Sequence, residues 1–147
     1  MALVLARILL GCFFVVSGLE KLISPHQNFL YVVQSYQLLP GLLEESASMA
    51  MPWVEFILGV FLILGLWLKI ALRSTLTLTT IFIVVVGQAL IRHLPINECG
   101  CFGELISVPL SAVIIIDSGL WLLIAILTVF IERASPLSLD RYFLRHK

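Results

Sequence analysis

Two cysteines separated by a single glycine are the residues of this sequence best suited to chemistry. They are Cys99 and Cys101, in the segment Asn-Glu-Cys-Gly-Cys-Phe-Gly at positions 97–103. A disulfide between residues so close in sequence requires a Cα separation below about 7 Å, and Gly100 permits the unusual backbone angles involved. Such strain makes a disulfide easier to reduce, whereas a structural disulfide normally closes a longer loop. The spacing favours thiol–disulfide exchange, and a structural turn is the alternative.

A metal site is another interpretation of the same segment. Thiolates from Cys99 and Cys101, with the imidazole of His93 and the carboxylate of Glu98, are ligands that suit zinc or copper. One imidazole beside a Cys-x-Cys pair falls short of a full set of four ligands. His93, Cys99 and Cys101 are therefore weak metal candidates. Cys12, in a long apolar segment, is expected to be a small buried packing residue.

Three ionisable side chains next to or within apolar segments are further candidates for a site. They are Glu55, Asp117 and Arg92, and charged groups in hydrocarbon are expensive enough to suggest a function. They could tune the thiolate content of the cysteines and move protons. They could instead be buried ion pairs that fix helix register, which is the favoured interpretation for Glu20, Lys21 and Arg92. Arg92 could pair with Glu55, Glu20 or Asp117.

The composition identifies the class of protein that must position these residues. Hydrophobic residues make up 61% of the 147 and charged residues 12%, against about 45–50% and about 25% in soluble domains. Four segments are long and apolar enough to cross a bilayer, at about 2–22, 49–68, 74–91 and 105–131. They are too long and too uniform for strands. We therefore expect an all-α polytopic membrane protein, a bundle of four transmembrane helices.

The same counts exclude other classes. Nine Lys and Arg balance nine Asp and Glu, so there is no basic surface for nucleic acid. Three cysteines are too few for a small scaffold held together by disulfides. The length allows one domain, which we place at residues 1–132 and expect to be followed by a basic cytoplasmic tail at 133–147.

The distribution of positive charge predicts the orientation in the membrane. Seven basic residues fall on the side of the two termini: Arg7, Lys69, Arg73, Arg133, Arg141, Arg145 and Lys147. Only Lys21 and Arg92 fall on the other side. The positive-inside rule then predicts cytoplasmic termini, with outward-facing loops at 20–48 and 92–104. Arg7 is expected to extend its charge toward the cytoplasmic surface.

The first outward loop has a helical pattern of its own. The segment Ser-Pro-His-Gln at 24–27 resembles a capping box with proline at the first helical position. Apolar residues at helical spacing follow, and Pro40-Gly41 is expected to end the helix. We expect a short helix lying in the outer membrane interface or a cap folded over the bundle.

The chain resembles the MauE/DoxX family of small four-helix membrane proteins over roughly residues 3 to 130. The matching pieces run in order: Arg7, Gly11, Ser17-Gly18 and Lys21; Tyr36 and Leu39-Pro40; Pro52-Trp53-Val54-Glu55, Gly59 and Gly65; and Cys99-Gly100-Cys101-Phe102-Gly103. The last piece is the most specific and is similar to the MauE branch. That branch tends to carry an Arg-Asp pair at the position of Asp117, where this sequence has Ile116 before the aspartate.

The resemblance implies a bacterial inner-membrane protein linked to redox metabolism. MauE-type proteins are associated with maturation or export of the disulfide-rich subunit of methylamine dehydrogenase, and relatives occur beside thioredoxin-like proteins. DoxX-type relatives are linked to thiosulfate oxidation with quinone as acceptor, which makes a quinone the candidate cofactor here. The expected partners are the lipid bilayer, an exported or periplasmic redox protein or a thioredoxin-like protein, and other membrane subunits.

We therefore expect that the protein assists the thiol–disulfide chemistry or the maturation of an exported redox protein. Its activity would be like that of a thiol–disulfide oxidoreductase. Its site would comprise Cys99, Cys101, Glu55, Asp117 and Arg92. Two other functions fit the sequence. One is a non-catalytic structural or assembly subunit of a larger membrane redox or transport complex, and the other is a transporter or ion channel.

Overall fold

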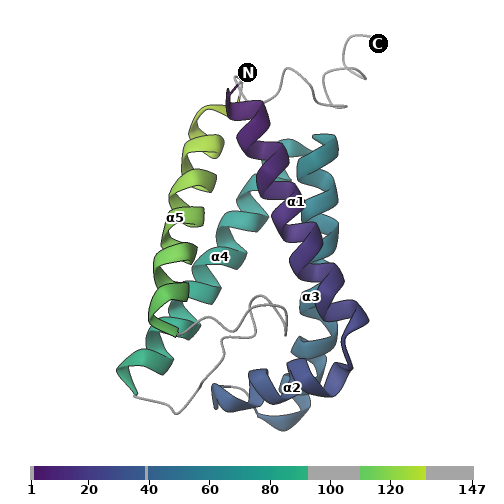
Figure 1. Cartoon of the computed structure of the whole chain (residues 1–147), viewed down its shortest axis with the longest axis vertical. Coiled ribbons are helices and arrows are strands. Elements are labelled where there is room, and N and C mark those ends of the chain that lie inside the picture. Colours follow the sequence, from purple (N-terminus) through teal and green to yellow (C-terminus); the bar gives the residue numbers. More distant parts are fainter. Residues whose placement is uncertain (1, 39, 93–109, 132–147) are drawn as a thin grey trace.

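The computed structural model describes residues 2–38, 40–92 and 110–131, and all regular structure within these ranges is helical. The helices are α1 (Ala2–Ile23), α2 (His26–Ser35), α3 (Gly41–Leu64), α4 (Leu68–Ile91) and α5 (Leu110–Val129). In Figure 1 the short α2 lies across one end of the bundle that α1, α3, α4 and α5 form. The prediction of an all-α bundle with one short additional helix is confirmed. His93, Cys99 and Cys101, and the tail at 133–147, lie outside the described residues.

Four of the helices are long and apolar enough to cross a membrane: α1, α3, α4, and α5 over Ala112–Val129. Large apolar side chains on their outer faces are exposed, among them Leu9 at 62%, Val84 at 64% and Ile115 at 73%. A soluble protein rarely exposes so much contiguous apolar surface, whereas lipid tails would cover it. The number of predicted spans is confirmed.

The boundaries of the middle spans differ from the prediction. The second span was placed at 49–68, but α3 already begins at Gly41 and ends at Leu64. It ends because Gly65 adopts the left-handed conformation, with φ 66°, and its N–H bonds to the carbonyl of Phe61. Trp67 is also left-handed, with φ 43°, and α4 starts at the next residue. Lys69 therefore lies in the first turn of α4 and not in a loop.

The start of α2 differs from the predicted capping box. Pro25 occupies the N-cap position, and no side chain caps the helix. The Ser24 hydroxyl donates instead to Oε1 of Glu20, 3.1 Å away. The expected stop at Pro40-Gly41 is also wrong, because Pro40 is the N-cap of α3. The short helix ends earlier, before Gln37, whose φ of 51° breaks the helical path.

Contacts with α3 and with the bundle end fix the position of α2. The ring nitrogen Nε2 of His26 lies 2.9 Å from the hydroxyl of Ser48 on α3. At the other end of the short helix, Tyr36 is buried against Val86 and Ala89 of α4 and Val113 of α5. These contacts make α2 a cap over the bundle, at the end where the membrane interface is expected.

Glycines allow α1 and α3 to touch backbone to backbone. A Cβ on Gly59 would lie 2.7 Å from the backbone nitrogen of Val15 and 2.8 Å from the carbonyl oxygen of Gly11. A Cβ on Gly18 would lie 2.7 Å from the nitrogen of Phe56 and 2.8 Å from the carbonyl oxygen of Pro52. Small residues at such contacts are a general device for packing helices in membranes. The pair α1–α3 is thus the most tightly packed part of the fold.

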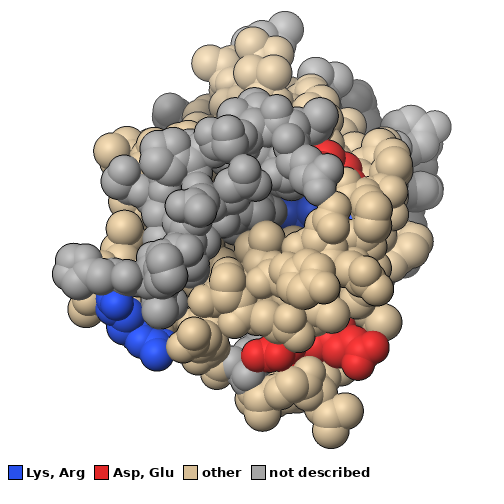
Figure 2. All heavy atoms as spheres, turned by 60° about the horizontal axis from the view of Figure 1, so that its bottom comes forward, with Lys and Arg blue, Asp and Glu red and all other residues tan. Residues whose placement is uncertain are grey.

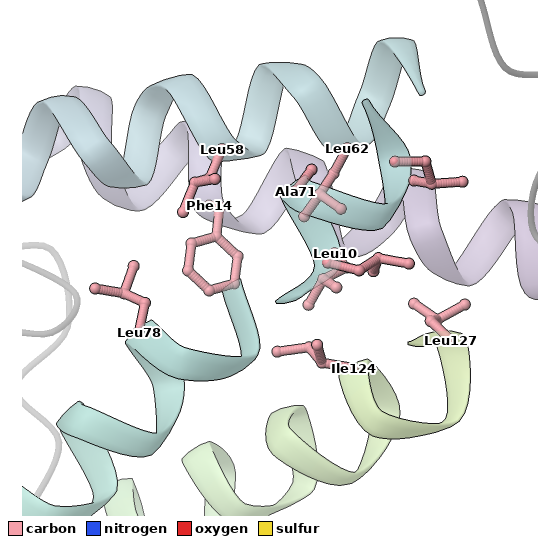
Figure 3. Close-up of a cluster of buried hydrophobic side chains, with 10 residues drawn as sticks. Leu10, Phe14, Leu58, Leu62, Ala71, Leu78, Ile124 and Leu127 are labelled. Atoms are coloured by element: carbon pink, nitrogen blue, oxygen red, sulfur yellow. The ribbon is translucent and has the colours of Figure 1, made fainter. Parts of the chain in front are cut away.

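An apolar cluster joins that pair to α4 and α5 in the half of the bundle near the termini. Figure 3 shows side chains from all four long helices converging on one point. The buried members are Leu10, Phe14, Leu58, Leu62, Leu68, Ala71, Leu72, Leu78, Ile124 and Leu127. Arg7 is fully buried in the molecule, contrary to the expectation that its charge would extend to the membrane surface.

Gly59→Ala should destabilise the protein by about 1–3 kcal/mol, because the added methyl group forces the backbones of α1 and α3 apart. The measurement is unfolding of the purified protein in detergent micelles. Gly119→Ala is the matched control, since nothing lies within 4 Å of its added Cβ. Equal stability of the two variants would contradict the close contact.

Candidate functional site

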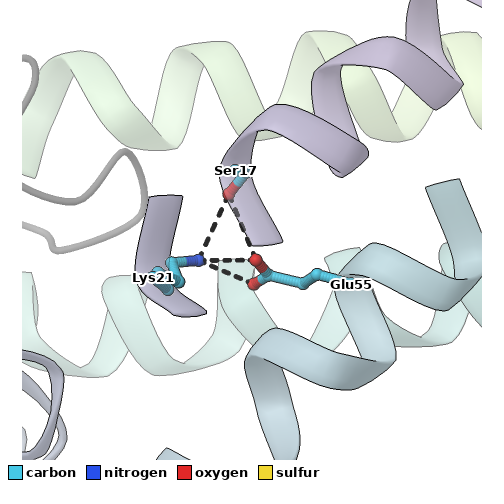
Figure 4. Close-up of polar contacts among 3 residues, drawn as sticks. All are labelled: Ser17, Lys21 and Glu55. Atoms are coloured by element: carbon cyan, nitrogen blue, oxygen red, sulfur yellow. Dashed lines mark hydrogen bonds and ion pairs between the residues drawn. The ribbon is translucent and has the colours of Figure 1, made fainter. Parts of the chain in front are cut away.

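A buried ion pair between α1 and α3 is the main polar feature of the described structure. The ammonium of Lys21 lies 2.7 Å from Oε2 and 2.8 Å from Oε1 of Glu55. The two side chains are only 2% and 1% exposed. Ser17 donates its hydroxyl to Oε2 of Glu55 at 3.1 Å and accepts a bond from Lys21 at 3.3 Å. Figure 4 shows the three side chains converging from the two helices.

The sequence places these groups together by helical spacing and by close packing. Ser17 and Lys21 are four residues apart, which puts both on the same face of α1. Between them lies Gly18, whose contact with the backbone of α3 at Pro52 and Phe56 brings the helices together. Glu55 follows Pro52 by three residues and so returns to the same face of α3. The short distances of the pair therefore depend on the glycine contact beside it.

Lys21 also contacts two aromatic rings. Its nitrogen lies 5.2 Å from the ring centroid of Phe29 on α2 and 5.8 Å from that of Phe82 on α4. Both distances fall within the range of cation–π attraction. The one ammonium thus connects its own helix to α2, α3 and α4.

A small cavity with a mainly apolar surface lies beside the ion pair, between the four long helices. Its polar lining comes from Ser17, Glu55, Thr79 and Asp117, one residue from each long helix. The remaining lining is apolar: Phe13, Phe14, Phe82 and Leu120. The space open to the centres of water molecules is about 20 Å³, enough for one water.

Asp117 is the least satisfied of these polar groups. It is 6% exposed, and its Oδ2 atom is buried without a hydrogen-bond partner. It lies seven positions beyond the start of α5 at Leu110, which is about 10 Å into the helix. An unpaired acid at this depth is expensive, which makes it the side chain most in need of an explanation.

Two of the three ionisable residues expected in the site come together, and the third does not. Glu55 and Asp117 line the same cavity. Arg92 is exposed at the C-cap of α4 and makes no ion pair with a described carboxylate. It lies 13 residues beyond Thr79, which is about 20 Å along the helix. Lys21, and not Arg92, is the partner of Glu55.

The segment that carries the cysteines is attached at the α2 end of the bundle. There α4 ends and α5 begins, as Figure 1 shows. Figure 2 looks onto this end of the molecule, where acidic side chains gather at one edge. Cys12 is exposed on the outer face of α1 and not buried as expected.

The expected ion-pair role of Lys21 is confirmed, but Ser17 and Thr79 were not identified from sequence. Ser17 could have been found from its spacing of four residues from Lys21. Thr79 carried no such signal, because it is one of several threonines in α4 and its hydroxyl bonds to the carbonyl of Thr75, as in many helices.

Tyr36 faces this region from α2. Its burial raises the pKa of its hydroxyl to about 12, and an ionised carboxylate at Asp117 contributes in the same direction. The tyrosine is therefore neutral throughout the physiological range of pH.

A family model described as methylamine utilisation protein MauE matches residues 1–131. No curated protein and no solved structure matches the chain.

Lys21→Met alone should cost about 3–5 kcal/mol of stability, because it leaves the charge of Glu55 buried without its partner, and Glu55→Leu alone should also be destabilising. The double variant Lys21→Met with Glu55→Leu should recover most of that loss, since no charge remains buried. Unfolding in detergent micelles measures all three. Additive losses in the double variant would contradict a coupled pair.

Tyr36→Phe should remove the part of the tyrosinate absorbance that appears only near pH 12. Because the folded protein holds this proton more tightly than the unfolded chain, stability should fall as the pH rises from about 10 to about 12. The stability of the Tyr36→Phe variant should therefore fall less over this range of pH. An unchanged alkaline titration in the variant would show that the hydroxyl of Tyr36 is not protected.

Proposed function

The chain belongs to the family of the methylamine utilisation protein MauE and is a multi-pass membrane protein, and from this we propose that it assists the thiol–disulfide chemistry that matures an exported redox protein. The observation that carries the proposal is the Cys99-Gly100-Cys101 motif in a member of this family. The partner would be a protein of methylamine metabolism or a thioredoxin-like protein.

The proposed reaction is a two-electron exchange. A thiolate of the partner attacks one sulfur of a Cys99–Cys101 disulfide and forms a mixed disulfide. A second thiolate of the partner displaces that sulfur, so the partner leaves with a new disulfide and the pair becomes a dithiol. The dithiol is then oxidised back to the disulfide, and its two electrons and two protons pass to an acceptor, for which a membrane quinone is the proposed chemical class.

The proposed orientation places this chemistry in an oxidising compartment. The segment between α4 and α5 starts and ends at the α2 end of the bundle. The excess of Lys and Arg on the opposite side supports cytoplasmic termini in a bacterial inner membrane. The cysteines would then face outward, where disulfides persist, and the tail at 133–147 would be cytoplasmic.

The charged residues would have different tasks in this reaction. Arg92 is the described cation nearest in sequence to Cys99, and a nearby cation favours the thiolate form. Glu55 is paired with Lys21, so it would act as a positioning residue that stabilises this end of the bundle. Asp117 has one carboxylate oxygen without a hydrogen-bond partner and is given no task in this exchange.

A second candidate function is that of a structural or assembly subunit in a larger membrane complex. The internal pairing of Lys21 with Glu55 favours it, because paired charges of this kind fix helix register without any chemistry. Fixed-ratio copurification with other membrane proteins, unchanged in cysteine variants, would support this function over the first.

Thiol trapping in intact cells tests the proposed chemistry. A membrane-impermeant maleimide should label Cys99 and Cys101 only after reduction. Cys99→Ser and Cys101→Ser should each abolish disulfide formation in the partner while the protein still inserts. Cys12→Ser is the matched control, because it removes a cysteine exposed on α1.

Each alternative result has a defined meaning. Full activity of the double cysteine variant would end the proposal. Labelling without prior reduction would indicate free thiols and favour a metal site or a resting reduced state of the pair. Labelling only after lysis would contradict the proposed orientation or indicate that a partner covers the segment.

A further inference from the structure

The cavity beside the ion pair contains one polar atom whose bonding capacity is not used. Both carboxylate oxygens of Glu55 accept bonds from Lys21, and Oε2 also accepts one from Ser17. The hydroxyl of Thr79 donates to a backbone carbonyl 2.9 Å away. Among the polar groups that line the cavity, Oδ2 of Asp117 is a buried atom without a hydrogen-bond partner, and the residue is 6% exposed.

The charges around this atom do not balance if Asp117 is ionised. Lys21 contributes one positive charge from α1, and Glu55 neutralises it from α3. Tyr36, the C-cap residue of α2 that faces this region, is neutral, and the lining from α4 consists of Thr79 and Phe82. A second carboxylate would leave one net negative charge among apolar rings, where an uncompensated charge is neutralised instead.

A proton fits the cavity better than a metal ion does. Hard cations such as Ca²⁺ or Mg²⁺ take about six or more oxygen ligands, and the cavity offers one unused oxygen. The ammonium of Lys21 beside Glu55 would also repel a second cation. Within the described residues, no three His, Cys, Asp or Glu side chains are close enough to hold a metal.

We propose that this cavity is a proton-binding site in which Asp117 takes up and releases the proton, and one water molecule links it to the Lys21–Glu55 pair. The carboxylate gains a proton from hydronium, and a water molecule is released in exchange. The space of about 20 Å³ holds the linking water, which accepts a hydrogen bond from the protonated carboxyl group. Neither cysteine takes part in this equilibrium.

The sequence offers an unusually direct test. Asp117 and Asp140 are the two aspartates of the chain, so protein made with aspartate labelled with carbon-13 at the side-chain carboxyl carries two signals. In the full-length Asp140→Asn protein, reconstituted in lipid, the remaining signal belongs to Asp117. Its chemical shift in solid-state NMR reports protonation directly.

We expect the shift of a protonated carboxyl group at neutral pH and a reversible change to that of a carboxylate at alkaline pH. The same behaviour should persist when Cys99 and Cys101 are both replaced by serine, so failure of the thiol chemistry would leave this result intact. In Glu55→Gln, Asp117 should become the counterion of Lys21 and give the carboxylate shift at neutral pH.

Three results would overturn the proposal. One is a carboxylate shift for Asp117 at every pH in the Asp140→Asn protein. The second is a shift that responds to sodium or potassium at constant pH, which would indicate a metal cation. The third is a protonated Asp117 in folded Glu55→Gln protein, which would show that the cavity does not couple the two acids.

Discussion

The ion pair between Lys21 and Glu55 is the interaction on which the architecture depends. Charges can be removed from water in an apolar bundle only when each finds its partner at hydrogen-bonding distance, and here the distance is 2.7 Å. Such an approach requires α1 and α3 to touch, which the glycines at positions 11, 18 and 59 permit. The rings of Phe29 and Phe82 then complete the surroundings of the ammonium. The close packing of α1 on α3, the pairing of the two charges and the position of α2 therefore all follow from the need to neutralise a buried ammonium.

The other half of the bundle is held in a different way. Helices α4 and α5 pack through apolar side chains, and the indole of Trp121 donates to the hydroxyl of Thr80 at 2.9 Å. The two halves meet through the central apolar cluster near the termini and through the cavity nearer to α2. The cavity thus lies between a pair of helices joined by charges and a pair joined mainly by apolar contacts. Asp117 of α5 lines this cavity, and its Oδ2 atom has no hydrogen-bond partner.

Much of the fold follows from the sequence, because four apolar segments of sufficient length have few alternatives. The ends of the helices were harder to predict. Gly65 and Trp67 reverse the chain through left-handed backbone angles that apolarity does not reveal, and Ser24 bonds to Glu20 in preference to capping α2. In the site, Glu55 and Asp117 were identified from their cost in hydrocarbon. The sequence alone could not identify the cation that pairs with Glu55, because pairing depends on the rotation and depth of each helix. In the structure Lys21 faces α3, whereas Arg92 lies beyond the cavity along α4.

The separation of the ion pair along the chain has a consequence for biogenesis. Lys21 and Glu55 are 34 residues apart, so α1 emerges from the ribosome well before its counterion. Until α3 arrives, Lys21 in the last turn of α1 has no counterion, and its long side chain would have to hold the ammonium in the aqueous interface. The charge would therefore leave water only when α3 packs against α1. Burial of this charge would then follow the pairing of the two helices.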